Sequence, residues 1–461
     1  MNLLAKRSMR MTEGNIWKQI ILFAVPMLIG NLFQQLYNTV DSMVVGNYVS
    51  TQALAAVGSV GPAINTLLGF FIGLSTGAGV VISRYFGAQD SQNLHDAVHT
   101  TMLLSLLAGV LMTVLGVLIT PYLLQLMATP DDVMDDATLY LRIYFAGILG
   151  LMVYNMGSGV LRAVGDSRRP LLFLIITSVI NVVLDLFFVL VFHMGIEGVA
   201  LATILAQFIS AGLVVRTLMR TTEDFRLILR DLRLSPHILR DILRIGMPAG
   251  LQMAVTSFSN VIVQSYINSF GSACMAGYSA YNKIDQFIML PMQSIALAST
   301  TFVGQNLGAG KLKRAKKGTR ISLLLAIGCT AVLTGLLLCL ARPLLMMFSS
   351  EEDVLAYGSM FIFWLSPCYV LCCFNQIYSG ALRGSGNSRA PMVIMLLSFV
   401  VFRQCYLYVV THFISNTTLP VILGYPAGWL VCSVLTFVYY MRNPLSGSRV
   451  VEENSPEKAK A

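Results

Sequence analysis

The sequence predicts an all-α integral membrane protein with twelve transmembrane helices in two six-helix lobes. Hydrophobic residues make up 56% of the chain and charged residues only 11%, against roughly 25% charged residues in a soluble domain. The apolar stretches reach the roughly 20 residues that a bilayer span requires. One segment also occurs twice: residues 158–170 read SGVLRAVGDSRRP, and residues 379–391 read SGALRGSGNSRAP.

The duplication extends beyond this turn. Phe86-Gly87-Ala88 corresponds to Leu307-Gly308-Ala309 at the same offset, and Pro26 corresponds to Pro248 to within one residue. Six spans precede the longest polar loop and six follow it, so both copies insert the same way up. The lobes are therefore predicted to be a parallel repeat about an axis along the membrane normal, an arrangement typical of transporters.

The spans are expected in two groups separated by a basic, helix-like linker. A lead-in, 1–17, comes before the N-lobe at 18–219, the linker is 220–241, the C-lobe is 242–440, and the tail 441–461 is expected to be disordered because it is polar. The predicted spans lie near residues 18–45, 54–82, 98–119, 138–160, 171–192, 198–219, 242–269, 276–303, 321–341, 357–381, 392–413 and 419–440.

Two local patterns refine the first two spans. Pro26 lies inside the first span and lacks an N–H, so we expect it to kink or weaken that helix. Gly69, Gly73 and Gly77 recur every four residues in the second span, a pattern that allows close helix packing.

The cations predict the orientation. With the N-terminus inside, most of the 31 Lys and Arg residues fall in inner segments, which is a strong positive-inside bias. We therefore expect a multi-pass protein of the cell (plasma or inner) membrane with both termini in the cytoplasm. The net charge of +9 is spread over short loops that face anionic headgroups, so nucleic-acid binding is not expected.

An enzyme is not expected either. Gly73-Leu74-Ser75-Thr76-Gly77 fits a nucleophile-elbow pattern, but that motif requires a strand-to-helix turn and here it lies inside an apolar span. The chain contains no Walker motif, so ATP is not the direct energy source.

Charged residues inside a membrane are costly and need an explanation. Asp41 lies in the first span and Asp185 in the fifth, with Asn181 one turn earlier on the same helix face. Thr203, near the start of the sixth span, could add a hydroxyl at the same depth. Together these oxygens suit H⁺ or Na⁺, and we predict a cation-coupling site. The alternative is that each aspartate hydrogen-bonds a neighbouring helix for structure.

The repeat favours the functional interpretation. At the repeat offset, Asp41 corresponds to Ile262 or Val263, and Asp185 to Tyr406. The two halves share a scaffold, but the second half has no acid at either position. The two aspartates are therefore not needed merely to build the fold.

The second half also has charges inside its spans. Lys283 and Asp285 lie in the eighth span and Arg403 lies deep in the eleventh. Arg403 must have a partner, and a structural ion pair with Asp285 is as good an explanation as a substrate contact.

These features together resemble the multidrug and toxic compound extrusion (MATE) family, and its DinF-like branch in particular. The resemblance covers about residues 14–440 and is carried by the first span with Pro26 and Asp41, by SRYFGAQ and FVGQNLGAG, by the paired LRAVGDSRRP and LRGSGNSRAP turns, and by INVVLDLFFV.

The resemblance implies a V-shaped pair of lobes around a central cavity, with coupling residues at Asp41, Asn181, Asp185 and Thr203. Asn155 matches a position lining the same lobe, and the substrate cavity is expected to include Gln34, Tyr37, Phe70 and Met152. The NorM-like pattern of acids in the seventh and tenth spans is absent: the seventh span has none, and Cys372 or its neighbours replace the tenth-span acid.

The implied activity is secondary active export of organic cations and other amphipathic compounds in exchange for H⁺ or Na⁺ by alternating access. Its partners are amphipathic or cationic drugs and the lipid bilayer, with no obligate protein partner. No cofactor is expected, and no metal beyond Na⁺. The alternatives are a lipid-linked saccharide flippase and a non-transporting membrane sensor or channel.

Overall fold

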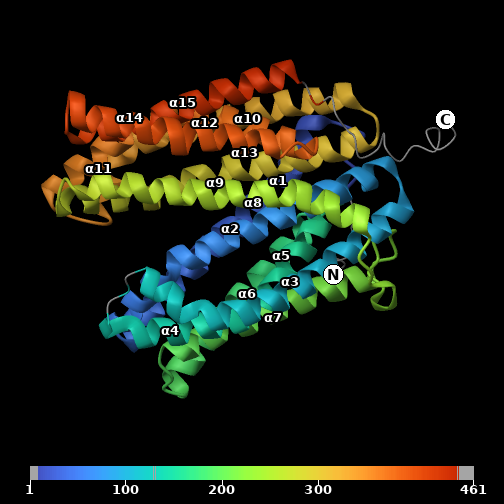
Figure 1. The fold of residues 1–461 in the computed structure, drawn as a ribbon, viewed down its shortest axis with the longest axis horizontal. Helices are drawn as coiled ribbons and strands as arrows, with labels where there is room; N and C mark the ends of the chain where they lie inside the picture. Colours follow the sequence, from blue (N-terminus) through green and yellow to red (C-terminus); the bar gives the residue numbers. More distant parts are fainter. Residues whose placement is uncertain (1–8, 128, 130, 444, 446–461) are drawn as a thin grey trace. The chain divides into compact units, whose positions relative to one another are not determined.

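The computed structural model describes residues 9–127, 129, 131–443 and 445, and all regular structure in these residues is helical (Figure 1). The all-α fold is therefore confirmed. The chain forms two compact units, which we call unit 1 and unit 2. Unit 1 contains Ile29–Gly246 with the described part of Met1–Arg10, and unit 2 contains Met11–Leu28 with the described part of Met247–Ala461. Much of the predicted lead-in and tail lies outside the described residues.

The first half of the chain supplies seven α-helices, two of which continue into a π-helical turn. They are α1 (Ile16–Val44) with η1 (Val45–Val49), α2 (Thr51–Ala88), α3 (Ser91–Leu126), α4 (Asp131–Ala146), α5 (Ile148–Ala163), α6 (Arg168–Leu186) with η2 (Phe187–Val191), and α7 (Ile196–Arg220).

The second half repeats the pattern with more interruptions. It contains η3 (Leu229–Asp231), α8 (Pro236–Asn268), α9 (Ser272–Gly308), α10 (Leu312–Met346), α11 (Glu352–Leu365), η4 (Ser366–Cys368), α12 (Tyr369–Gly384), α13 (Arg389–Met395), η5 (Leu396–Phe402), α14 (Arg403–Val409), η6 (Val410–Ile414) and α15 (Thr418–Arg442).

Each of the twelve predicted spans is helical. Ten helices of the described residues are long and apolar enough to cross a membrane, and α4 with α5 makes an eleventh candidate that is bent by 47°. The predicted seventh span, α8, is a continuous helix that is not among them, because polar residues such as Gln252, Ser259 and Asn260 interrupt its apolar sequence.

The two copies of the repeated turn have the same local structure. Gly165 and Gly386 take positive φ angles of 88° and 80°, which glycine adopts without strain. Asp166 Oδ1 accepts a hydrogen bond from Arg169 N at 3.1 Å, and Asn387 Oδ1 accepts one from Ala390 N at 3.2 Å. The Asp-to-Asn difference between the copies therefore preserves the cap of the following helix.

The predicted glycine packing is present at Gly77. A Cβ on this residue would lie 2.6 Å from both Gly246 N and Ile242 O, so α2 and the first part of α8 are in backbone contact. Gly159 of α5 similarly lies against Ser75, whose hydroxyl would be 2.5 Å from an added Cβ. These contacts fix α2, α5 and the start of α8 within unit 1.

The predicted linker, 220–241, is helix-like only in part: its last residues, from Pro236, begin α8, whereas residues 221–235 are mostly not helical. Between the end of α7 and the start of α8 at Pro236, only η3 is helical. The linker instead bonds to α3: Ile228 N donates to His99 Nε2 at 3.0 Å, and Ser235 N donates to Thr100 Oγ1 at 3.1 Å. These tertiary bonds replace helical ones.

Candidate functional site

The two aspartates singled out by the sequence occupy equivalent local positions on different helices. Asp41 lies in the last turn of α1 and Asp185 in the last turn of α6. Each helix then widens into a π turn, η1 or η2, and these two turns pack against each other. The sequence showed no signal for the π turns, which are rare and often occur at functional sites.

The structure brings the two carboxyl groups together inside unit 1. The side chains of Asp41 and Asp185 lie within hydrogen-bonding reach and interact electrostatically. Asp185 is fully buried, yet within the described part of the chain neither of its Oδ atoms makes a hydrogen bond of normal geometry, and Asp41 Oδ1 makes none either. Buried polar atoms are nearly always paired, so this pair is suited to a small ligand that supplies the missing partner.

Asn181 adds an amide to the same face of α6. It is 2% exposed, and neither Oδ1 nor Nδ2 has a hydrogen-bond partner among the residues that the structure describes. The i,i+4 spacing with Asp185, and the burial of both, agree with the predicted shared face.

Thr203 is level with Asp185. Helices α6 and α7 run antiparallel and are joined by a 2.9 Å hydrogen bond from Ser210 Oγ to Thr177 Oγ1. At 1.5 Å per residue, Asp185 lies about 12 Å from Thr177 along α6, and Thr203 lies about 10 Å from Ser210 along α7. Because the helices run antiparallel, both distances extend in the same direction from the bond. The Thr203 hydroxyl donates to Val199 O at 3.0 Å, which leaves its oxygen free to accept or to coordinate.

The sequence did not predict Tyr140 beside the aspartates, nor the two side chains that continue from it, Tyr144 and Gln207. Tyr140 of α4 lies within electrostatic range of both carboxyl groups and stacks on Tyr144, with ring centroids 6.5 Å apart. Tyr144 in turn hydrogen-bonds Gln207 of α7. Nothing in their sequence spacing distinguishes these residues from the many other aromatic and amide residues of the spans.

The five residues predicted to line a cavity have different environments. Tyr37 lies one turn before Asp41 and interacts with it. Gln34 is exposed and Phe70 is half-buried. Asn155 donates from Nδ2 to Leu151 O at 2.9 Å, while its backbone oxygen accepts from Ser75 Oγ at 2.8 Å. Met152 is fully buried in the core of unit 1, so its side chain faces no open space in this conformation.

The ion pair of Arg403 with Asp285, one of the two explanations that the sequence left open, is not formed. Arg403 Nη2 donates to Ser259 Oγ at 2.6 Å and to Asn260 Oδ1 at 2.9 Å, and its guanidinium packs over the Tyr425 ring. The hydroxyl of Tyr281 donates to Asp285 Oδ1 at 3.4 Å. Lys283 is exposed and lies 5.4 Å from the Phe348 ring centroid. Neutral side chains therefore contact Arg403 and Asp285 separately, and Arg403 Nε has no hydrogen-bond partner among the described residues.

Pro26 lies within α1, which continues as a helix on both sides of it. The predicted weakness is therefore a missing hydrogen bond rather than a break, because the proline cannot donate to the carbonyl one turn earlier. The chain passes from unit 2 to unit 1 between Leu28 and Ile29, less than one turn after the proline.

The site as a whole is an oxygen-rich group without a protein cation. Among the described residues, neither aspartate forms an ion pair with Lys, Arg or His. Two carboxylates this close repel each other when both are charged, so the arrangement favours the uptake of a proton or of a small cation.

Comparisons with known proteins agree with this architecture. The MatE family model matches residues 26–187 and again 248–409, so its two matches begin at Pro26 and Pro248 and follow the internal repeat. The chain is 30% identical over 436 residues to the probable multidrug resistance protein YoeA of Bacillus subtilis, covering 93% of this chain and 94% of YoeA.

A second relative and a solved structure extend the likeness. The probable multidrug resistance protein YpnP of Bacillus subtilis is 31% identical over 431 residues, covering 93% of this chain and 96% of YpnP. A solved MOP superfamily transporter from Pyrococcus furiosus is similar in fold, with a TM-score of 0.89 and 24% identity over 96% of this chain and 99% of that one.

Proposed function

Because this chain belongs to the multidrug and toxic compound extrusion (MatE) family of membrane transporters, we propose that it exports amphipathic or cationic drugs in exchange for H⁺ or Na⁺. Two relatives that align along nearly their whole length are named as probable multidrug resistance proteins, which supports this substrate class. Such an exporter acts in the cell membrane, and the cation distribution supports cytoplasmic termini.

The single observation that carries the coupling proposal is the buried carboxyl pair. Asp41 and Asp185 lie together, and the oxygens of Asp185 have no normal hydrogen-bond partner. A cation arriving from outside would neutralise their repulsion and would be held by Asn181 and Thr203 as well. Its binding would change the packing of α1 against α6 and so couple ion entry to drug release by alternating access.

The energy available from one ion is of the required size. One charge moving through about 100 mV supplies roughly 2.3 kcal/mol, and a hundredfold drug gradient requires about 2.7 kcal/mol. One or two ions per transport cycle therefore suffice.

The test is efflux of an ethidium-type dye from proteoliposomes with an imposed H⁺ or Na⁺ gradient. We expect efflux in wild type under one of the two gradients, and its loss in Asp41→Asn, which keeps the shape but removes the charge. Asp285→Asn is the matched control, because it neutralises a carboxylate in unit 2 and should leave coupled efflux intact.

The outcomes separate the possibilities. Export by Asp41→Asn at the wild-type rate would refute coupling through this site. No efflux by folded wild-type protein under either gradient would refute drug export and favour a lipid-linked saccharide as substrate. Dye binding without net flux would indicate a sensor.

A further inference from the structure

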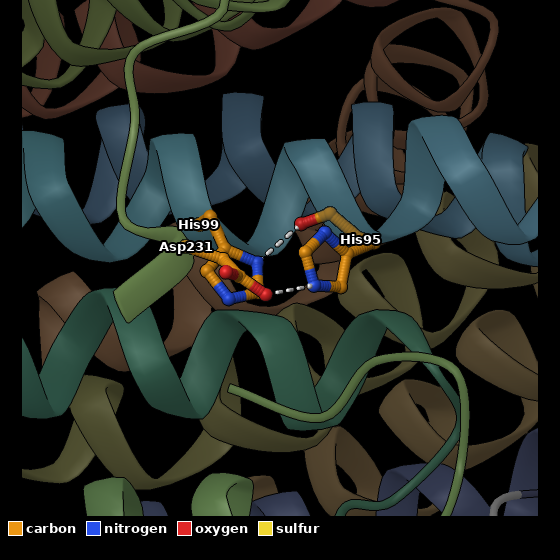
Figure 2. A group of neighbouring side chains, drawn as sticks. All are labelled: His95, His99 and Asp231. Carbon is orange, nitrogen blue, oxygen red and sulfur yellow. Dashed lines mark hydrogen bonds and ion pairs between the residues drawn. The ribbon is translucent and has the colours of Figure 1, made fainter. Parts of the chain in front are cut away.

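A second cluster of ligand-type side chains lies in unit 1, away from the aspartate pair. His95 and His99 are four residues apart on α3 and so share one helix face. Asp231 is the last residue of η3 in the linker. One ligand atom from each of the three residues lies within 4.8 Å of the others, and Figure 2 shows the two imidazole rings facing each other with the Asp231 carboxylate beside them.

Hydrogen bonds to the backbone fix the orientation of the His99 ring. Its Nδ1 lies 2.7 Å from the His95 carbonyl oxygen, which can only accept, so Nδ1 carries the hydrogen. Its Nε2 lies 3.0 Å from Ile228 N and 3.1 Å from Ile228 O, so the neutral ring accepts from the amide. A metal-binding histidine generally donates from one ring nitrogen to a carbonyl or carboxylate and binds the metal with the other; in His99 the lone pair of that other nitrogen now accepts from the Ile228 amide.

The Asp96 carboxylate faces one nitrogen of the His95 ring. Its Nδ1 lies 3.7 Å from Asp96 Oδ1, and Asp96 is itself held by Arg233 Nη2 at 2.7 Å. The opposite nitrogen, Nε2, faces Asp231 Oδ2 at 3.6 Å (Figure 2). That separation is long for a hydrogen bond but close to the roughly 3.4 Å between two ligand atoms of a tetrahedral Zn²⁺ with bonds of about 2.0–2.1 Å.

We propose that His95, His99 and Asp231 bind a divalent transition-metal ion of the zinc class. Two imidazole nitrogens and one carboxylate oxygen suit Zn²⁺, Co²⁺, Ni²⁺ or Cu²⁺, whereas Ca²⁺ and Mg²⁺ require oxygen ligands. The side chains of His95 and Asp231 are 30% and 48% exposed, so water can reach the ion and complete its coordination. Binding draws the three ligand atoms together and replaces the contact between His99 and Ile228.

The position of the site gives the ion a structural consequence. The linker is attached to α3 at His99 and Thr100, and the ion would exchange the hydrogen bond at His99 for a metal-mediated attachment through Asp231 while the bond at Thr100 remains. The site lies on the segment that joins the two halves of the chain, and it is separate from the proposed coupling site.

The test is metal binding by the full-length, tag-free protein in detergent. Zn²⁺ is titrated by calorimetry, and Co²⁺ is followed by its visible ligand-field absorption. We expect a single saturable site in wild type and a loss of affinity of at least about tenfold in His95→Gln and in Asp231→Asn. His237→Gln is the matched control, because His237 is an exposed histidine in the first turn of α8 and should bind as wild type does.

His99 is left unchanged in these variants because its ring also holds the linker. The proposal is overturned if wild-type protein takes up no Zn²⁺, or if both variants bind as tightly as wild type. Thermal melting without metal checks that the two variants remain folded, and since the substituted side chains are partly exposed, we expect no change there.

Discussion

At the scale of single residues, the environment of a buried charge decides its role. Asp185 is buried without normal hydrogen bonds and beside a second carboxyl group. Arg403 is equally buried, but neutral oxygens and an aromatic ring surround it. Arg403 Nη2 is held by two neutral oxygens although Nε has no hydrogen-bond partner among the described residues, so the guanidinium is anchored in the fold. The carboxyl group of Asp185 has no such anchor and is suited to a ligand.

Arg403→Met should therefore destabilise unit 2. The substitution keeps an extended apolar shape but leaves Asn260 Oδ1 without its charged donor, and removal of one partner from a buried polar group typically costs about 2 kcal/mol. At 2–4 °C per kcal/mol, the thermal midpoint in detergent should fall by roughly 4–8 °C. The control is Arg342→Met, which loses only an exposed ion pair with Glu352. Equal thermal midpoints for Arg403→Met and Arg342→Met would contradict this assignment.

The sequence identified part of the site and misjudged the rest for a physical reason. Asp41 and Asp185 could be found because a carboxylate is rare and costly in an apolar span. The contacts of Tyr140 with these aspartates could not be found, because an aromatic residue is common in an apolar span and its insertion there needs no special explanation. For Arg403 the sequence left open an ion pair with Asp285 and a contact with substrate, whereas neutral Ser259 and Asn260 bind it in the structure. The spacing of His95 and His99 is visible in the sequence, whereas Asp231 joins them only through tertiary structure.

At the scale of helices, backbone contact at glycine positions sets the packing of unit 1. The recurrence of glycine every four residues in the second span predicted a close neighbour, and Gly77 has one in α8. The identity of that neighbour could not be predicted, because the repeat indicates equivalent positions and not contacts between helices.

Gly77→Ala should weaken the contact between α2 and α8. Its Cβ would lie 2.6 Å from backbone atoms, which cannot move without separating the helices, and overpacking of this kind costs about 1–3 kcal/mol. We expect a lower thermal midpoint and less folded protein by size-exclusion chromatography. In Gly212→Ala of α7, nothing lies within 4 Å of the new Cβ, so the midpoint should stay constant or rise. A matching rise in Gly77→Ala would show that the contact is not tight.

At the scale of the whole molecule, the repeat also relates the two helices that are divided between the units. Helix α1 passes from unit 2 to unit 1 after Leu28, and α8 passes from unit 1 to unit 2 after Gly246. Pro26 and Pro248, which the repeat relates, each lie within two residues of the transition. Both units are therefore joined by helices that have a missing hydrogen bond near the transition.

Pro26→Ala tests whether this weak point is used during transport. Alanine restores the hydrogen bond and stiffens α1, so gradient-driven dye efflux should slow severalfold while folding and dye binding persist. Pro121→Ala is the control, since Pro121 also lies inside a long helix, α3, but remote from either transition. Wild-type efflux by Pro26→Ala, or an equal loss in both variants, would mean that flexibility at Pro26 is not used.

The π turns η1 and η2 have a consequence for how ion binding could be transmitted. A π turn is closed by an i→i+5 hydrogen bond and so contains one more residue than an α turn; a shift of this extra residue along the helix is a one-residue change of register. Each such one-residue step would rotate the side chains it crosses by about 100° and shift them by about 1.5 Å. Because η1 and η2 directly follow the turns that carry Asp41 and Asp185, a cation could change the register of both helix ends in the manner of a ratchet, while the bodies of α1 and α6 remain in place.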